Sequence, residues 1–198
     1  MSNPPRLIIE GTNYSGKDTL ISALAPYCKN SLVIQTRGYF RKALTNLKDQ
    51  GGLGLDASYL LRYFQERTLS LLPIIKSVIH EELIFQRLHL TDIVYCFLYL
   101  NAEQDYSGLE SELNQVRVAL ILLDIDNESL ERRQSKDPRG ASGHVSRSLP
   151  DLIKRRDLYR KFFNESQMQR KILINNSDGI CSPDEQAKSI LDWWKNQE

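Results

Sequence analysis

Cysteine is scarce in this 198-residue sequence, and neither sign of charge is in excess. The three cysteines, Cys28, Cys96 and Cys181, lie far apart, include no CxxC pair and leave an odd count, which argues against a disulfide framework or a zinc site. Lysine and arginine total 26 against 25 aspartate and glutamate residues, so the formal net charge is +1. Such a molecule has no large field for holding duplex DNA or an anionic membrane, so any polyanion site must be local.

Long apolar runs are absent as well. The first run, Leu7–Ile9, stops at Glu10 and is too short for the apolar part of a secretory signal, and no window approaches a membrane span. We therefore expect a cytoplasmic protein without membrane association. The apolar share of 41% allows one sizeable core, so we expect residues 1–198 to form a single domain.

Short β-branched runs alternate with longer helical patterns along the chain. This alternation predicts crossover connections, and hence a mostly parallel five-stranded sheet covered on both faces in a three-layer α/β fold. The expected strands are Leu7–Ile9, Leu32–Ile34, Leu83–Phe85, Val116–Leu123 and Ile172–Ile174. The expected helices are Lys17–Leu24, Phe40–Leu47, Asp56–His80, Thr91–Leu100, Asn127–Lys136, Leu149–Asn164 and Pro183–Trp194.

A glycine-rich segment directly after the first expected strand carries the strongest functional signal, and it runs straight into a helical pattern. Its two glycines permit a tight turn with inward-pointing N–H groups, the helix adds the positive end of its dipole, and Lys17 can reach the outer phosphates of a nucleotide. We therefore predict a phosphate-binding loop that holds ATP. Its residues are Gly11, Thr12, Asn13, Tyr14, Ser15, Gly16, Lys17, Asp18 and Thr19.

The residue after the lysine departs from the usual form of such a loop. A serine or threonine normally ligates magnesium there, whereas this sequence has Asp18, with the hydroxyl one residue later at Thr19. One residue is about 100° around a helix, so Thr19 cannot simply replace its neighbour. The Asp18 carboxylate is a hard oxygen ligand for Mg²⁺, directly or through water. We expect ATP and Mg²⁺ as cofactors, with Asp18 and Thr19 as the candidate metal residues.

Positive charge is concentrated between Glu131 and Lys161, where ten lysines and arginines face four acids, a net of +6. This stretch includes residues 137–144, which are too rich in glycine, proline and serine for a packed element. A mobile basic lid over phosphates, near residues 132–147, is one interpretation, and a solvated helix face is the other. Asp124, at the end of an apolar run, resembles a Walker B aspartate, but we expect Asp124 or Asp126 to cap the following helix.

The stretch LIIEGTNYSGKDTLISAL resembles the opening of the thymidylate kinase and deoxynucleoside kinase group of P-loop kinases, and the likeness covers residues from about 5 to 195. The resemblance implies a P-loop kinase fold with a helical lid, nucleotide substrates and, because thymidylate kinases are commonly dimers, a homodimer. Thr36-Arg37 resembles the family's Thr-Arg pair, whose arginine binds the acceptor's phosphate in thymidylate kinases. Tyr63 is similar to the aromatic that stacks on the acceptor base, and Arg67 to the arginine one turn later.

Further matches follow in chain order. Gln86-Arg87 occupies the place of the family's Asp-Arg or Glu-Arg motif, and Tyr95 stands where the family has a tyrosine. Arg132 and Lys136 look like the lid residues, one against adenine and one on the transferred phosphate. The helical spacing agrees, because Arg132 and Lys136, like Tyr63 and Arg67, are four residues apart and share a face. The alternatives are core packing for Tyr63 and surface ion pairs for Arg37, Arg67 and Arg87.

Two departures bear on the acceptor, since Gln86 and Asn13 stand where family members carry acids. A sugar hydroxyl needs a carboxylate base as it attacks, whereas a monophosphate has its second pKa near ~6 and is already a dianion at neutral pH. We therefore expect ATP-dependent transfer to a deoxynucleoside monophosphate, with Lys17, Arg87 and Lys136 as the catalytic residues. A deoxynucleoside kinase and a catalytically impaired nucleotide-binding protein are the alternatives. Action on polynucleotide ends is disfavoured because no extended basic groove is evident.

Overall fold

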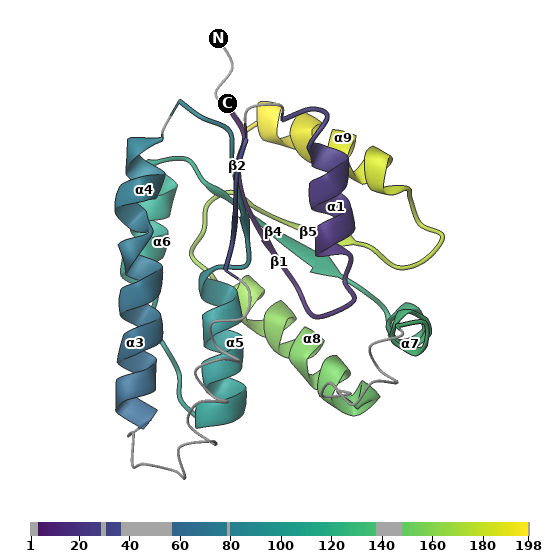
Figure 1. Cartoon of the computed structure of the whole chain (residues 1–198), viewed down its shortest axis with the longest axis horizontal. Helices are drawn as coiled ribbons and strands as arrows, with labels where there is room; N and C mark the ends of the chain where they lie inside the picture. Colours follow the sequence, from purple (N-terminus) through teal and green to yellow (C-terminus); the bar gives the residue numbers. More distant parts are fainter. Residues whose placement is uncertain (1–3, 29–30, 37–56, 79, 138–147, 198) are drawn as a thin grey trace.

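Five strands form one parallel sheet in the computed structural model, which describes residues 4–28, 31–36, 57–78, 80–137 and 148–197 (Figure 1). The strand order is β2-β3-β1-β4-β5. The strands are β1 (Arg6–Glu10), β2 (Leu32–Gln35), β3 (Leu83–Gln86), β4 (Ala119–Asp124) and β5 (Lys171–Asn175). The helices are α1 (Lys17–Leu24), α3 (Ala57–Ser70), α4 (Leu72–Ser77), α5 (His89–Leu100), α6 (Ser107–Gln115), α7 (Asn127–Ser135), α8 (Leu149–Glu165) and α9 (Pro183–Lys195).

The central strand β1 is fully buried and separates two apolar cores. Leu7 and Ile9 pack with α1 and α9 on one face, and Ile8 packs with α3, α4, α5, α6 and α8 on the other. Figure 1 shows the same division, with α1 and α9 lying together on one side of the sheet. Because successive strand side chains point to opposite faces, a continuous apolar run is what a strand covered on both sides requires. The predicted three-layer α/β fold is confirmed.

All strands run in the same direction, so their carboxyl ends meet at one edge of the sheet. Ile8 pairs with both Phe85 of β3 and Leu120 of β4, which places the loops after these three strands side by side. Open parallel sheets bind ligands at this edge. The sequence-derived bounds of α1, Lys17–Leu24, agree with the structure.

Three elements differ from expectation. The single helix expected over Asp56–His80 is wrong, because α3 ends at Ser70 and α4 begins at Leu72 with a proline in its first turn, where the missing proline N–H costs nothing. The strand expected from Val116 begins at Ala119 instead, because Val116 is the C-cap residue of α6 and Arg117 has a φ of 57°. Helix α6 itself was not expected, and the predicted helix Phe40–Leu47 lies outside the described residues.

The expected helix caps are present. Ser182 forms a capping box with Glu185 at the start of α9, which satisfies N–H groups that the first helical turn leaves without acceptors. Asp126 accepts a hydrogen bond from the Ser129 N–H at 2.6 Å and caps α7, whereas Asp124 does not cap a helix and instead pairs with Arg160 of α8. Within the described part of the chain, every helix is too short or too polar to cross a membrane.

Candidate active site

The segment between β1 and α1 folds as a tight loop that requires both of its glycines. Gly11 and Gly16 have φ values of 141° and 87°, which lie in the left-handed region where side chains are strained. A Cβ atom on Gly11 would lie 2.6 Å from the Leu123 carbonyl oxygen, and one on Gly16 would collide with the Asn176 side chain. Contacts from β4 and from the segment after β5 therefore fix the shape of this loop.

Lys17 is buried in the loop that it follows. Its Nζ donates hydrogen bonds to the carbonyl oxygens of Gly11 at 2.7 Å and Thr12 at 2.5 Å, and to Ser15 Oγ at 3.1 Å. Helix α1 begins at Lys17, so the first N–H groups of the helix have no acceptor within it and its positive end faces the loop. A loop of this kind can bind a phosphate chain through main-chain N–H groups and one ammonium group.

An arginine on α7 holds the outer side of this loop. Arg133 donates from Nη1 to the Tyr14 carbonyl oxygen at 3.0 Å and from Nη2 to the Asn176 carbonyl oxygen at 2.7 Å, and it forms an ion pair with Asp178. Asn176 Nδ2 adds a hydrogen bond to the Ser15 carbonyl oxygen at 2.6 Å. The sequence analysis missed Arg133 and Asn176; their only signals are a position beside Arg132 and a position directly after β5.

Asp18 and Gln86 meet beside the loop. The Gln86 Nε2 group donates a hydrogen bond to Asp18 Oδ1, while Gln86 Oε1 is buried and has no hydrogen-bond partner among the described residues. A carboxylate and an unsatisfied amide oxygen, both hard oxygen donors, fit the ligand preference of Mg²⁺ or of water bound to it. Thr19, the other candidate, is exposed on α1. The residues present therefore suit a magnesium ion at this position.

Arg87 lies between the loop and α8. Its Nη2 donates to Asn13 Oδ1 at 3.2 Å and its Nη1 to the Tyr159 hydroxyl at 3.3 Å, and the Tyr159 hydroxyl is 2.8 Å from Thr91 Oγ1. Burial lowers the pKa of Arg87, but Tyr159, Tyr95 and Glu10 outweigh this effect and keep the pKa above its ordinary value. A permanently charged guanidinium therefore stands beside the phosphate loop.

Glu10 is a buried carboxylate at the end of β1. Its Oε1 accepts hydrogen bonds from the backbone N–H groups of Leu88 at 2.6 Å and Thr91 at 3.3 Å, and its Oε2 accepts one from Thr91 Oγ1 at 2.6 Å. These bonds cap the start of α5, so both oxygens serve the fold. Two residues missed by the sequence analysis, Glu10 and Tyr159, thus position Thr91 and Arg87.

Arg67 is engaged with α5. Its Nη2 contacts both carboxylate oxygens of Asp92, at 2.9 and 3.0 Å, and Asp92 also accepts a hydrogen bond from Thr68 Oγ1 at 2.5 Å. Burial raises the pKa of Asp92 to about 6, although Arg67 and Thr68 act in the opposite direction. The contacts described for Arg67 are therefore structural ones between α3 and α5.

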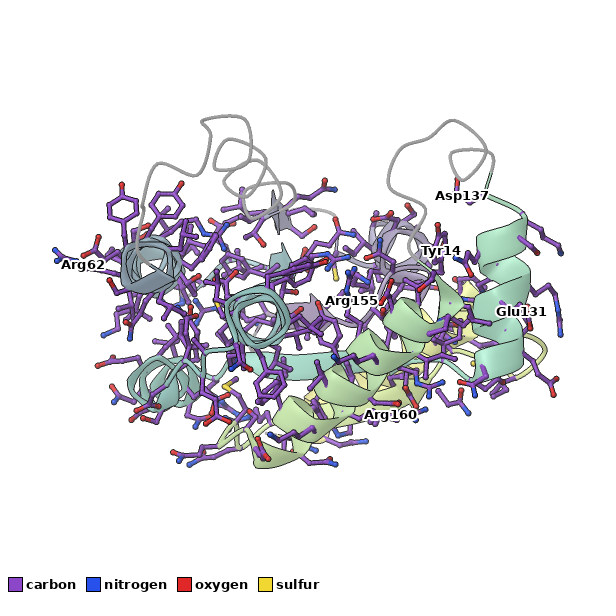
Figure 2. All side chains as sticks on the ribbon, turned by 90° about the horizontal axis from the view of Figure 1, so that it is seen from below. Tyr14, Arg62, Glu131, Asp137, Arg155 and Arg160 are labelled. Atoms are coloured by element: carbon purple, nitrogen blue, oxygen red, sulfur yellow. The ribbon has the colours of Figure 1, made fainter. Side chains whose placement is uncertain are left out.

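Tyr63 lies on the exposed side of α3. Its side chain is 40% exposed, lines a shallow hollow with Tyr59, Arg62 and Glu66, and touches the ring of Phe64 edge-on. Figure 2 shows the neighbouring Arg62 on the outer side of α3, far from Tyr14 of the loop. Core packing does not account for Tyr63, and stacking on an acceptor base stays a prediction.

The remaining candidates have few described contacts. Arg132 is half exposed and pairs with Asp178 at 3.2 Å, and Lys136 is exposed at the end of α7. Thr36 Oγ1 donates to the Arg87 carbonyl oxygen at 2.9 Å, which ties the end of β2 to the segment after β3. Arg37 and residues 138–147 of the expected lid lie outside the described residues, so the lid stays a prediction.

The structure thus brings together the phosphate loop, Asp18, Gln86, Arg87 and Tyr95 at the carboxyl edge of the sheet. Neither a scan of protein-family models nor a search of curated proteins found a match to the chain. Solved structures do resemble it. Thymidylate kinase from Candida albicans is 15% identical, with a TM-score of 0.66 over 100% of this chain and 93% of that one.

Two further structures agree. Deoxyadenosine kinase from M. mycoides is 14% identical, with a TM-score of 0.59 over 98% of this chain and 100% of that one. Thymidylate kinase from Ehrlichia chaffeensis is 17% identical, with a TM-score of 0.56 over 96% of this chain and 99% of that one. The chain therefore has the P-loop nucleotide kinase fold. Within that class, its architecture is similar to that of thymidylate and deoxyadenosine kinases.

Proposed function

We propose that this protein transfers the γ-phosphoryl group of ATP to a deoxynucleoside monophosphate. The observation that carries the proposal is the geometry of the loop: Lys17 Nζ is held inside it, α1 begins at Lys17, and Arg87 contacts the loop at Asn13. Phosphoryl transfer requires chiefly positioning and charge stabilisation, which amide groups, an ammonium and a guanidinium can supply.

Each residue has a distinct role in this proposal. Lys17 and the loop N–H groups bind the β- and γ-phosphates, and Arg87 stabilises charge on the transferred group. Asp18, with Gln86 Oε1 beside it, would hold Mg²⁺, which when bound neutralises charge on the phosphate oxygens. Lys136 would reach the transferred phosphate and Arg132 the adenine. Closure of the lid would exclude water and suppress hydrolysis of ATP.

A phosphate acceptor is favoured over a sugar hydroxyl because the Glu10 carboxylate is already engaged in hydrogen bonds. This is the carboxylate that acts on Arg87 electrostatically, and its oxygens already accept three hydrogen bonds from the start of α5. A carboxylate so engaged is poorly placed to accept a proton from a sugar, whereas a monophosphate dianion needs no base. Arg37, Tyr63, Arg67 and Tyr95 are the predicted acceptor residues.

The wider setting is part of the same proposal. The chain would act in the cytoplasm as a single domain and form a homodimer, which sedimentation analysis of the purified protein would test. The three cysteines are free thiols in the structure, with Cys28 and Cys96 buried and Cys181 exposed, as a reducing compartment allows.

The decisive experiment follows ATP consumption with a panel of deoxynucleosides, deoxynucleoside monophosphates and oligonucleotides. Lys17→Ala serves as the blank, because it removes the ammonium without altering the two glycines. We expect Mg²⁺-dependent turnover with one or more monophosphates and at least a hundredfold loss in Lys17→Ala, as for other groups that stabilise transition-state charge. Equal rates in the blank and wild type would exclude catalysis, and a response to deoxynucleosides alone would assign the hydroxyl acceptor.

A further inference from the structure

Helices α5 and α8 meet along a row of polar side chains that starts at the sheet edge. Thr91 of α5 contacts Tyr159 of α8, and one turn further out the guanidinium of Arg155 packs over the rings of Tyr95 at 5.2 Å and Tyr99 at 5.7 Å. Arg155 and Tyr159 are four residues apart and so share one face of α8. Figure 2 shows Arg155 on the side of α8 that faces α5 and Arg160 on the other side.

Arg155 is buried but poorly satisfied. Its side chain is 4% exposed, and its Nη2 donates to the Tyr99 hydroxyl at 2.5 Å. Its Nε and Nη1 have no hydrogen-bond partner among the described residues. Among the described residues, no carboxylate forms an ion pair with Arg155. The guanidinium thus keeps at least three N–H donors for another group.

The adjacent Arg156 is also buried, and its hydrogen bonds provide a comparison for Arg155. Arg156, 7% exposed, donates from Nη1 to the Ile125 carbonyl oxygen at 3.2 Å and to Asn127 Oδ1, and from Nε and Nη2 to Asp157. Every nitrogen of Arg156 has a partner. A buried charge without a counterion generally costs several kcal/mol. Because Arg155 lacks the partners that Arg156 has, we expect an anion to bind to it.

Arg87 and Arg155 both contact Tyr95. Tyr95 interacts with Arg87 electrostatically and through its hydroxyl, and its ring lies under Arg155. Neither of these two guanidinium groups forms a salt bridge with a carboxylate of the described residues, and the tyrosine that they share lies near the phosphate loop. Guanidinium groups bind phosphate oxygens through paired N–H donors.

We propose that Arg155 binds a phosphate group of a substrate together with Arg87, and that, where this phosphate is the acceptor's, Arg155 selects a phosphorylated acceptor over a nucleoside. This inference rests on the proposed function, and it adds a specificity-determining residue from α8 to the acceptor site. The phosphate is that of the acceptor or the one being transferred, since both carry the same chemistry.

The test measures ligand affinities by calorimetry and melting temperatures without ligand. Arg155→Met removes the charge but keeps much of the side-chain length, Arg155→Lys keeps the charge, and Lys154→Met removes a positive charge from the exposed neighbouring position. The probes are dTMP and thymidine, each titrated into the ADP complex, and ATP alone.

We expect Arg155→Met to bind dTMP about tenfold or more weakly and thymidine unchanged, because a hydrogen bond to a charged group is worth about 1.5–3 kcal/mol. Arg155→Lys should be intermediate and Lys154→Met unchanged. The ligand-free melting temperature of Arg155→Met should equal or exceed that of wild type, since an unpaired buried charge is removed. A loss in ATP affinity instead of dTMP affinity would support the site and assign the phosphate to the donor.

Two outcomes of the dTMP, thymidine and ATP titrations would overturn the proposal. One is unchanged affinity for dTMP and ATP in Arg155→Met. The other is an equal loss of dTMP and thymidine binding together with a lower melting temperature, which would make Arg155 a packing residue. If wild type binds neither dTMP nor thymidine, thymidylate is not its acceptor, and inorganic phosphate added to the ADP complex then decides whether Arg155 binds phosphate. Thermal protection by phosphate that is lost in Arg155→Met supports the site, and an equal response in both proteins refutes it.

Discussion

Asp18 brings one negative charge to the start of α1, and its neighbour Gln86 is a neutral amide. The amide donates to one carboxylate oxygen, and its own Oε1 is buried without a hydrogen-bond partner among the described residues and can face a cation. Without a cation, the Asp18 charge would repel a triphosphate in the loop. The dependence of nucleotide binding on Mg²⁺ should therefore be set largely by this residue.

Asp18→Asn tests this role. The asparagine Oδ1 can still accept the hydrogen bond from Gln86, so we expect the free energy of unfolding to change by less than about 0.5 kcal/mol. The Mg²⁺ concentration needed for half-maximal ATP affinity should rise about tenfold, and ATP should bind more tightly than to wild type when Mg²⁺ is absent. Fluorescence titration of a labelled ATP analogue measures both, with Thr19→Val as control. An unchanged Mg²⁺ requirement would count against ligation by Asp18.

Asp92 makes the stability of the molecule depend on pH. Its pKa is raised from 3.8 to about 6 in the folded protein, chiefly by burial. Between these values the folded state holds a proton that the unfolded state releases. Asp92 therefore reduces stability as the pH rises from about 4 to about 6, by roughly 3 kcal/mol for a shift of about two pKa units, and the loss remains complete above pH 6.

The comparison is with Asp92→Asn, which cannot titrate at this position. Urea unfolding between pH 4 and pH 7 should show wild type losing roughly 3 kcal/mol relative to the variant. The ion pair with Arg67 forms with the ionised Asp92 and is already one of the causes that set its pKa, so it adds no separate slope to the comparison. Parallel pH profiles for the two proteins would contradict the raised pKa.

At the scale of secondary-structure elements, α7 and the phosphate loop are joined by one side chain. Arg133 contacts the loop at Tyr14, the segment after β5 at Asn176, and Asp178. Because three donors act from one planar group, lysine cannot reproduce these contacts. Arg133 should therefore keep the loop in the shape that binds phosphate.

We expect Arg133→Lys to bind ATP about tenfold more weakly with its net charge unchanged, and to exchange the amide hydrogens of residues 12–16 faster than wild type. Hydrogen exchange followed by mass spectrometry and ATP calorimetry provide the measurements. Lys154→Arg, an exchange in the opposite direction at an exposed position of α8, is the control. Unchanged exchange in the loop would show that α7 does not support it.

The sequence predicts the strands well because each contains a short apolar run, which is buried throughout in β1 and β3 and partly exposed in the edge strands β2 and β5. It fails where two signals overlap. Val116 continues the helical spacing of Leu109 and Leu113, which are buried in α6, but it also opens the β-branched run of β4, so the helix was missed and the strand began too early. The break between α3 and α4 was missed because the apolar spacing continues through the proline in the first turn of α4.

In the candidate site, residues that are contiguous in sequence could be identified, whereas residues brought together by packing could not. The phosphate loop is contiguous in sequence, so its glycines and Lys17 could be identified directly. Arg133, Asn176 and Arg155 reach the site only through the packing of α7, β5 and α8, and no local spacing marks them. The pairing of Asp18 with Gln86, 68 positions apart, likewise depends on β1 lying next to β3.

At the scale of the whole molecule, the parallel sheet places polar residues from several strands at one edge. Glu10 of β1, Gln86 of β3, Asp124 of β4 and Asn175 of β5 all stand at carboxyl ends of strands. The loops that follow come from distant parts of the chain. A ligand that bridges these loops should therefore stabilise the entire fold against unfolding.

ADP at a concentration of 100 times its dissociation constant should raise the free energy of unfolding by about 2.7 kcal/mol. For a chain of this length, the melting temperature should rise by roughly 5–10 °C. Scanning calorimetry measures this rise in melting temperature. Adenosine, which lacks phosphates, should raise the melting temperature only slightly. An equal shift in wild type and Lys17→Ala at the same ADP concentration would mean that the nucleotide binds away from the loop.

The hydrogen bonds of Lys17 to its own loop also affect how a nucleotide enters. The ammonium group has already left bulk water and rests on the carbonyl oxygens of Gly11 and Thr12. A phosphate that binds in the loop therefore does not have to remove water from the ammonium group. Its oxygens replace two main-chain carbonyl oxygens as hydrogen-bond acceptors of Lys17. Most of the dehydration of this cation thus occurs when the chain folds, so association should need little rearrangement of the lysine.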